Sequence, residues 1–136
     1  MEKLPAPIPR QNPAKPTART GWQETMRLAN IAKVIELLHS YEEPPIKLST
    51  LCRDAGVSER TLRSIFKEVF GVGPNRYLHV RRLHQVRAAL SIAQPNTDSV
   101  SQIAARFGFS DSGRMASDYH RLFGEYPSQT LMRSLV

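Results

Sequence analysis

The chain carries one sequence motif twice, in the same order and with nearly the same spacing. The two copies share apolar, glycine and proline positions over residues 51–78 and 103–131. In the first copy these positions are Leu51, Cys52, Gly56, Val57, Ser58, Leu62, Phe66, Gly71, Pro74 and Leu78, and in the second they are Ile103, Ala104, Gly108, Phe109, Ser110, Met115, Tyr119, Gly124, Pro127 and Leu131. The offset is 52 residues from Gly56 to Gly108 and 53 residues from Phe66 to Tyr119, so one residue is inserted just after Gly108. The pattern indicates an internal duplication, which requires the fold to build one small unit twice.

Each copy has the pattern of two helices joined by a tight turn. A short apolar helix is expected to stop near Gly56 or Gly108, because glycine readily adopts the left-handed conformation that ends helices. Ser58, or Ser110 with Asp111, can then accept a hydrogen bond from the free amides of a second helix. In the first copy the apolar stripe of this helix is Leu62, Ile65, Phe66, Val69 and Phe70, with Glu59, Arg60, Arg63, Ser64 and Lys67 facing outward. This is the helix-turn-helix signature, in which the second helix enters the major groove of DNA.

The fold class predicted from these patterns is all-α, with about seven helices that form two helix-turn-helix units joined by a long linker helix. Residues 1–20 hold five of the ten prolines and predict a linker or disordered tail. Residues 21–93 are expected to form the first unit, and residues 94–136 the second. The first unit includes a roofing helix over 21–41, whose apolar stripe is Trp22, Met26, Ile31, Val34, Ile35 and Leu38, and a linker helix, opened by Pro74, over about 77–93. The second unit is expected to close with a short helix that carries Leu131, Met132 and Leu135.

Charge and composition favour an anionic partner and exclude several classes of protein. The formal net charge is +7; residues 48–93 carry eight Arg or Lys against three acids, whereas residues 94–136 carry four of each. The single cysteine and the absence of an apolar run near 18 residues predict a cytoplasmic, nucleoid-associated protein without disulfides or a membrane span. No nucleophile–base set or paired histidine spacing is visible, so the sequence predicts no enzyme, metal or cofactor.

These residues together resemble the DNA-binding domain of the AraC/XylS family of bacterial transcription regulators. The resemblance covers residues 31–133, approximately. Its motifs are Leu62-x-x-Ile65-Phe66-Lys67, Gly71-x-x-Pro74-x-x-Tyr77-Leu78, Arg82-Leu83 followed by Arg87, Ile103-Ala104-x-x-x-Gly108-Phe109-Ser110-Asp111, Phe123-Gly124 and Pro127-Ser128. It implies two recognition helices in successive major grooves, contact with RNA polymerase, often as an activator, and an effector-binding domain upstream in a longer protein. Because no coiled-coil heptad is present, this fragment by itself is expected to be a monomer.

Candidate base-reading residues lie on the outward faces of the two recognition helices. Arg60 and Arg63 can each bond guanine O6 and N7, and Thr61 between them offers a methyl and a hydroxyl group. Ser64 and Ser117 stand where the family usually has arginine. The full candidate set is Arg60, Thr61, Arg63 and Ser64 in the first unit and Ser112, Arg114 and Ser117 in the second. The second unit is expected to read fewer bases, because Arg114 is the only cation in its reading segment. Gly113 also weakens its helix by ~1 kcal/mol relative to alanine. Asp118 would repel phosphate if it faced outward.

Candidate phosphate contacts lie mainly at helix starts, where exposed amides and the positive helix end favour an anion. These are Lys47, Ser49 and Thr50 in the first unit and Ser99 in the second; Lys67 and, on the linker helix, Arg81 complete the set. Arg82 matches a position of the family at which a structural role, tying helices together, is as ready an explanation as a DNA contact.

Two alternatives from other classes stay open at this point. The first is a protein-interaction module of helix-turn-helix descent that binds an acidic partner and has lost specific DNA binding, which the near-neutral second unit favours. The second is an enzyme such as an alkylation-repair protein, which would need an exposed reactive cysteine. Cys52 is instead expected to be a buried apolar filler where two helices cross.

Overall fold

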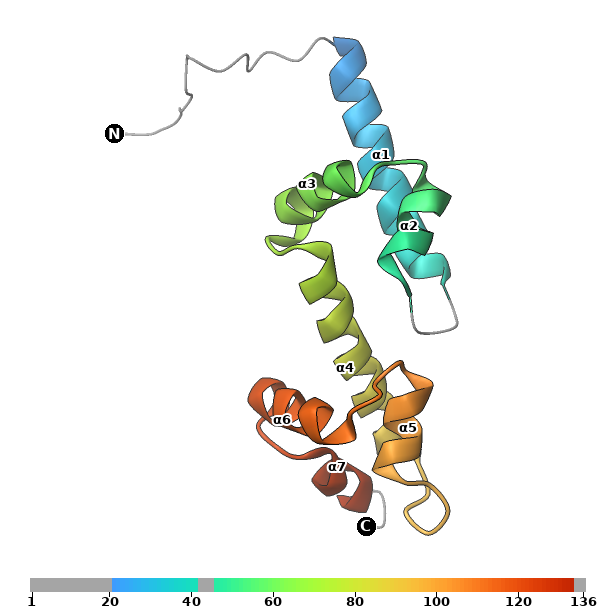
Figure 1. The fold of residues 1–136 in the computed structure, drawn as a ribbon, viewed down its shortest axis with the longest axis vertical. Coiled ribbons are helices and arrows are strands. Elements are labelled where there is room, and N and C mark those ends of the chain that lie inside the picture. The colour runs from blue at the N-terminus through green and yellow to red at the C-terminus, as the bar shows by residue number, and fades with distance from the viewer. Residues whose placement is uncertain (1–20, 42–45, 134–136) are drawn as a thin grey trace, which may run out of the picture.

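The computed structural model describes residues 21–41 and 46–133, so the predicted tail over residues 1–20 and the predicted apolar contact of Leu135 lie outside the described residues. The described part is all-α, as predicted. Its seven helices are α1 (Gly21–Ser40), α2 (Leu48–Ala55), α3 (Glu59–Phe70), α4 (Pro74–Ile92), α5 (Val100–Arg106), α6 (Ser112–Phe123) and α7 (Pro127–Arg133). Figure 1 shows α4 running between two helical groups, with α1, α2 and α3 at one end and α5, α6 and α7 at the other.

Turns and helix caps form as the duplicated motif predicts. Gly56 ends α2 in the left-handed region, with φ of 70°, and the Ser58 hydroxyl accepts a hydrogen bond from the Thr61 amide at the start of α3. In the second copy Gly108 has φ of 90°, and Asp111, rather than Ser110, caps α6 by accepting from the Arg114 amide. Both units therefore have the same helix, turn and capped helix.

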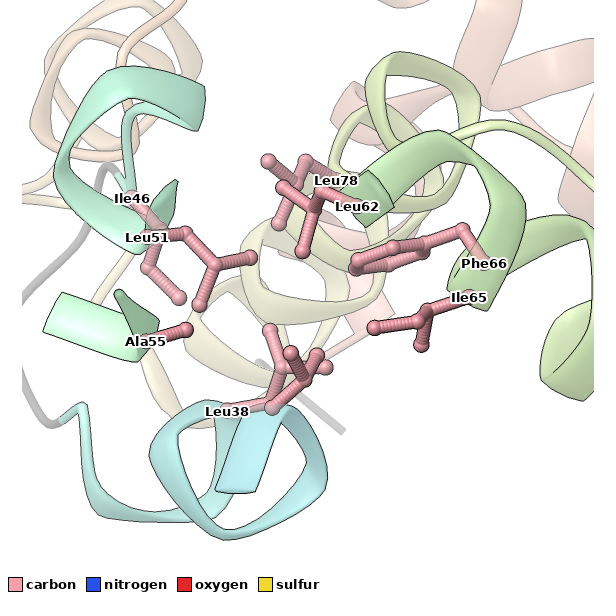
Figure 2. Packing of buried hydrophobic residues seen from close by; sticks show 9 residues of the cluster. Leu38, Ile46, Leu51, Ala55, Leu62, Ile65, Phe66 and Leu78 are labelled. Atoms are coloured by element: carbon pink, nitrogen blue, oxygen red, sulfur yellow. The ribbon is translucent and has the colours of Figure 1, made fainter. Parts of the chain in front are cut away.

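The first hydrophobic core lies where α1, α2, α3 and the start of α4 meet. Figure 2 shows side chains from these elements pointing toward one another. The buried members are Val34, Leu38, Ile46, Leu51, Ala55, Leu62, Ile65, Phe66 and Leu78. Tyr41, which follows α1, donates its hydroxyl proton to the Asp54 carboxylate at 2.6 Å, and burial together with this bond raises the pKa of Tyr41 to about 12. Each fully buried aliphatic or aromatic side chain stabilises the fold by about 1.5–3 kcal/mol.

The second core is formed by the rest of α4 with α5, α6 and α7. Its buried members are Leu83, Val86, Leu90, Ala93, Ile103, Ala104, Met115, Tyr119 and Leu131. The linker helix therefore contributes side chains to both cores, with Leu78 in the first and Leu83 onward in the second. Because α4 is a continuous helix of 19 residues, it holds the two units at a fixed separation.

Four of the residues predicted to make apolar contacts are exposed, and Ile31, Ile35 and Phe70 are half-buried. Val34 and Leu38 of α1 are buried as expected, but Trp22 is 72% exposed and Met26 is 45% exposed. The first turns of α1 extend past α2 (Figure 1), and at this end Trp22 and Met26 line an open groove beside α3 instead of packing into a core. Val69 and Met132 are also exposed, at the edges of their helices.

Two smaller expectations need correction. Cys52 is half-buried against the first core rather than fully buried. The linker helix begins at Pro74 itself, three residues before the predicted start, because proline is well suited to the first turn of a helix.

Among the described helices, none is both long and apolar enough to cross a membrane.

Candidate nucleic-acid interface

The recognition helix of the first unit, α3, exposes a cationic face opposite its buried stripe. Arg60, Arg63, Ser64 and Lys67 are all exposed. Arg60 makes no ion pair within the described part of the chain, whereas the Arg63 guanidinium donates to the Glu59 carboxylate one helical turn earlier. Arg60 and Lys67, which also makes no ion pair among the described residues, are therefore available without breaking an existing contact, whereas Arg63 is not.

Thr61 is only half-buried, and its polar groups serve the start of α3. Its amide donates to the Ser58 hydroxyl oxygen at 3.1 Å, and the Ser58 hydroxyl donates to Thr61 Oγ1 at 3.1 Å. The Thr61 hydroxyl thus belongs to the helix cap, and its methyl group remains the part suited to a thymine methyl.

The recognition helix of the second unit, α6, presents fewer charges. Arg114 and Ser117 are exposed, and Ser112 is half-buried. Ser117 donates its hydroxyl proton to the Gly113 carbonyl at 3.4 Å, so its side chain folds back along the helix. The outer face of α6 therefore resembles that of α3 in position but carries less positive charge.

Asp118 turns toward the linker helix. Its Oδ2 atom lies 3.0 Å from His79 Nε2 on α4, and its Oδ1 atom lies 3.6 Å from Arg121 Nη1. The His79 ring also packs edge-on against Phe109 in the turn before α6, with 5.7 Å between the ring centres. This contact, which the sequence did not predict, attaches α6 to α4 and places the Asp118 carboxylate beside partners of the same domain.

The candidate phosphate contacts differ in how far their side chains are engaged. Lys47 precedes α2, is exposed and makes no side-chain cap, and Ser49 and Lys67 are also exposed. Thr50 is half-buried. Ser99 forms a capping box with Gln102 at the start of α5, in which each side chain accepts from the other's amide.

Arg81 and Arg82 on the linker helix differ in how their side chains are engaged. Arg81 Nη2 donates to the Leu38 carbonyl at 2.7 Å, which ties α4 to the end of α1. Arg82 Nε is buried without a hydrogen-bond partner among the described residues, and burial lowers the pKa of Arg82. No local sequence signal could have indicated the Arg81 contact, since its two residues lie 43 positions apart.

The described residues include no cluster of metal ligands and no activated thiol. No three His, Cys, Asp or Glu side chains within residues 21–41 and 46–133 gather as they would around a metal ion. Burial raises the pKa of the half-buried Cys52 thiol, which disfavours the thiolate form that a nucleophile requires.

Comparison with known proteins identifies the class. A profile of the helix-turn-helix domain family matches residues 51–133. The chain is 36% identical over 101 residues to "XylDLEGF operon transcriptional activator 3" of Pseudomonas putida, covering 74% of this chain and 30% of that protein. It is 32% identical over 101 residues to "HTH-type transcriptional regulator GlxA" of Rhizobium meliloti, with the same coverage of 74% and 30%.

Two solved structures share the fold. The crystal structure of a probable AraC family transcriptional regulator from Rhodopseudomonas palustris superposes with a TM-score of 0.65 at 32% identity, over 77% of this chain and 96% of that one. An AraC-type regulator structure from Chromobacterium violaceum has a TM-score of 0.66 at 24% identity, over 81% and 96% of the two chains, and supports the fold alone.

The duplicated helix-turn-helix fold and its exposed recognition helices define a DNA-binding domain of the transcription-regulator class. The chain belongs to the AraC/XylS family, as the sequence motifs predict, and this is a family of regulators rather than enzymes. The chain spans 30% of the length of the two curated relatives named above.

Proposed function

We propose that this domain reads a bipartite site on double-stranded DNA, with α3 and α6 in successive major grooves. The observation that carries the proposal is that α3 and α6 lie toward one side of the molecule, with α2 and α5 toward the other (Figure 1). A helix of 19 residues is about 28 Å long, and equivalent points of successive grooves lie ~34 Å apart. The width of the two units supplies the remaining distance.

Within this site the first unit supplies most of the sequence reading. Arg60 and Arg63 each bond a guanine, while Ser64 and the Thr61 methyl contact adjacent bases. The exposure of Arg60, Arg63 and Ser64 supports these roles, as does the absence of an ion pair to Arg60 within the described residues.

The second unit contributes shape fit and few base contacts. Arg114 is its principal reading side chain, with Ser112 and Ser117 beside it. The engagement of the Ser117 hydroxyl with its own helix supports a smaller reading role. The attachment of Asp118 to His79 supports a close approach of α6 to phosphate, because the carboxylate lies against α4.

Phosphate contacts from Lys47, Ser49, Thr50, Lys67, Arg81 and Ser99 position the domain. Neutralising ~5 to 8 phosphates gives a log–log salt dependence of about −4 to −7. Arg81 makes its phosphate contact through the guanidinium nitrogens that do not donate to Leu38. A flat response of affinity between low and moderate salt would contradict this set of contacts.

In the intact protein the domain acts within a longer, cytoplasmic and nucleoid-associated regulator. An upstream effector-binding domain senses a signal, and the DNA-bound protein contacts RNA polymerase to activate transcription. The Pseudomonas relative is named as a transcriptional activator of an operon, which supports this part of the proposal. The domain by itself is a monomer.

Selection of bound duplexes from a random pool of ~30 base pairs, at about 150 mM salt, tests the proposal. Two enriched blocks about 10 base pairs apart are expected. A single enriched block would overturn the bipartite reading. No enrichment by a folded domain would overturn DNA reading altogether and favour the protein-interaction alternative with an acidic partner.

A further inference from the structure

A groove of about 350 Å³ lies between the first turns of α1 and the recognition helix α3. Trp22, Gln23 and Met26 line it from α1, and Arg60, Thr61 and Ser64 line it from α3. These last three residues belong to the proposed base-reading set, so whatever enters the groove also meets the reading face of the first unit.

One ion pair joins α1 to α3 beside this groove. The Arg27 guanidinium binds the Glu68 carboxylate on α3, and it also donates from Nη2 to Glu24 on its own helix at 2.6 Å. These partners, Glu24 first, raise the pKa of Arg27. Because Arg27 is engaged by Glu24 and Glu68, Arg60 is the cation of the groove left without an ion pair among the described residues. Its guanidinium is therefore the group of the groove that can pair with an anion.

We propose that the first turns of α1 are part of the DNA interface of the first unit, and that Trp22 packs against the sugar–phosphate backbone beside the groove that receives α3. This inference rests on the function proposed above. A helix is 10–12 Å across with its side chains, and the major groove is about 12 Å wide. An element attached to the flank of α3 therefore lies against the backbone that bounds the groove.

The chemistry of Trp22 suits this position. Trp22 is 72% exposed at the edge of the groove, so most of its surface is open to a ligand. Its ring face packs against deoxyribose, and its Nε1–H donates to a phosphate oxygen. Such a contact positions the protein on DNA and does not distinguish one base from another.

Trp22 also provides the measurement, because it is the only tryptophan of the 136 residues. Binding of a fluorescein-labelled duplex of ~30 base pairs is followed by anisotropy at low salt, where backbone contacts are strong. Acrylamide quenching of Trp22 emission is then compared in the free chain and at saturation with the unlabelled duplex. We expect quenching to fall clearly on DNA binding, because the indole becomes covered. Unchanged quenching at saturation would overturn the inference.

Substitution separates a contact from mere proximity. We expect Trp22→Ala to weaken binding about tenfold, equally for specific and unrelated duplexes, because an anchoring aromatic is lost. The salt slope stays unchanged, since Trp22 carries no charge, whereas Arg60→Ala lowers the slope by about one. Trp22→Phe keeps the ring and loses the N–H donor, so its affinity lies between those of Trp22→Ala and the wild type.

Leu28→Ala is the matched control, because Leu28 is 53% exposed on the same helix and does not line the groove. It should bind DNA like the wild type. Equal DNA affinity of the Trp22→Ala and Leu28→Ala variants would overturn the inference. Tighter DNA binding by Trp22→Ala would also overturn it, because Trp22 would then obstruct the groove. If the chain binds no duplex at all, the proposed function is refuted. If the chain binds DNA with an affinity that does not change on substitution of Trp22, only this inference is refuted.

Discussion

The buried hydroxyl of Thr130 connects α7 to the recognition helix α6, and its removal should destabilise the second unit. Thr130 is 3% exposed and Tyr119 is fully buried, and their hydroxyl oxygens lie 2.7 Å apart. Thr130→Val keeps the shape of the side chain and leaves the Tyr119 hydroxyl without this partner. An unsatisfied buried hydroxyl costs about 1–3 kcal/mol, so the free energy of unfolding should fall by that amount.

The same substitution should change how stability depends on pH. The Thr130 hydroxyl donates to the Glu125 carboxylate, and Arg133 donates to it from Nη1 at 2.8 Å and Nη2 at 2.6 Å. The Thr130 bond first, then Arg133, lowers the pKa of Glu125 below its ordinary value of 4.5. A carboxyl group whose pKa is lower in the folded chain stabilises the fold above its ordinary pKa, and this contribution is lost as the pH falls through the folded value. Thr130→Val should therefore cost more stability near neutral pH than in acid.

Urea unfolding followed by far-ultraviolet circular dichroism measures both effects, at about pH 7 and about pH 3. Thr97→Val is the matched control because Thr97 is exposed in the loop after α4, and it should stay within about 0.5 kcal/mol of the wild type. A Thr130→Val variant that matches this control, or that loses the same stability at both pH values, would refute the reasoning.

Three further predictions concern the recognition helices. Glu59→Gln should raise DNA affinity about twofold, because it releases Arg63 from an exposed ion pair one helical turn away. The measurement is a double-mutant cycle followed by fluorescence anisotropy, in which the gain in affinity should vanish on an Arg63→Ala background. A gain that persists on that background would contradict this account. Arg63→Ala should weaken binding more than Arg114→Ala in the same titration, because the first unit supplies most of the reading, and the reverse order would reverse the assignment of the units. Gly113→Ala should stabilise the fold by about 0.5–1 kcal/mol and raise the Tm, because alanine favours the helix more than glycine does. The added Cβ would meet Asp111 Oδ1 at 3.5 Å, which is an ordinary contact distance. A lower Tm would show that the α6 cap is disturbed.

Local signals in the sequence were enough to predict the helices and the turns between them. The cap at Ser58, the left-handed Gly56 and the inward positions of α4 lie where the repeated motif places them. Each depends on residues within about one turn of one another, so spacing alone identifies them. Trp22 and Met26 show where periodicity is insufficient. Their spacing matches the buried stripe of α1, but burial also requires close packing against a neighbouring helix, and at that end α3 meets α1 only across an open groove.

The duplicated motif by itself determined an all-α chain with two helix-turn-helix units, and its motifs determined the family. Only the tertiary structure decided which side chains on the outer faces are already engaged. Arg27 with Glu68, His79 with Asp118 and Arg81 with the Leu38 carbonyl join residues 41, 39 and 43 positions apart. The physical reason is that a polar side chain at a helix surface has many geometrically possible partners. Its actual partner depends on how whole helices cross, which the packing of the two cores sets.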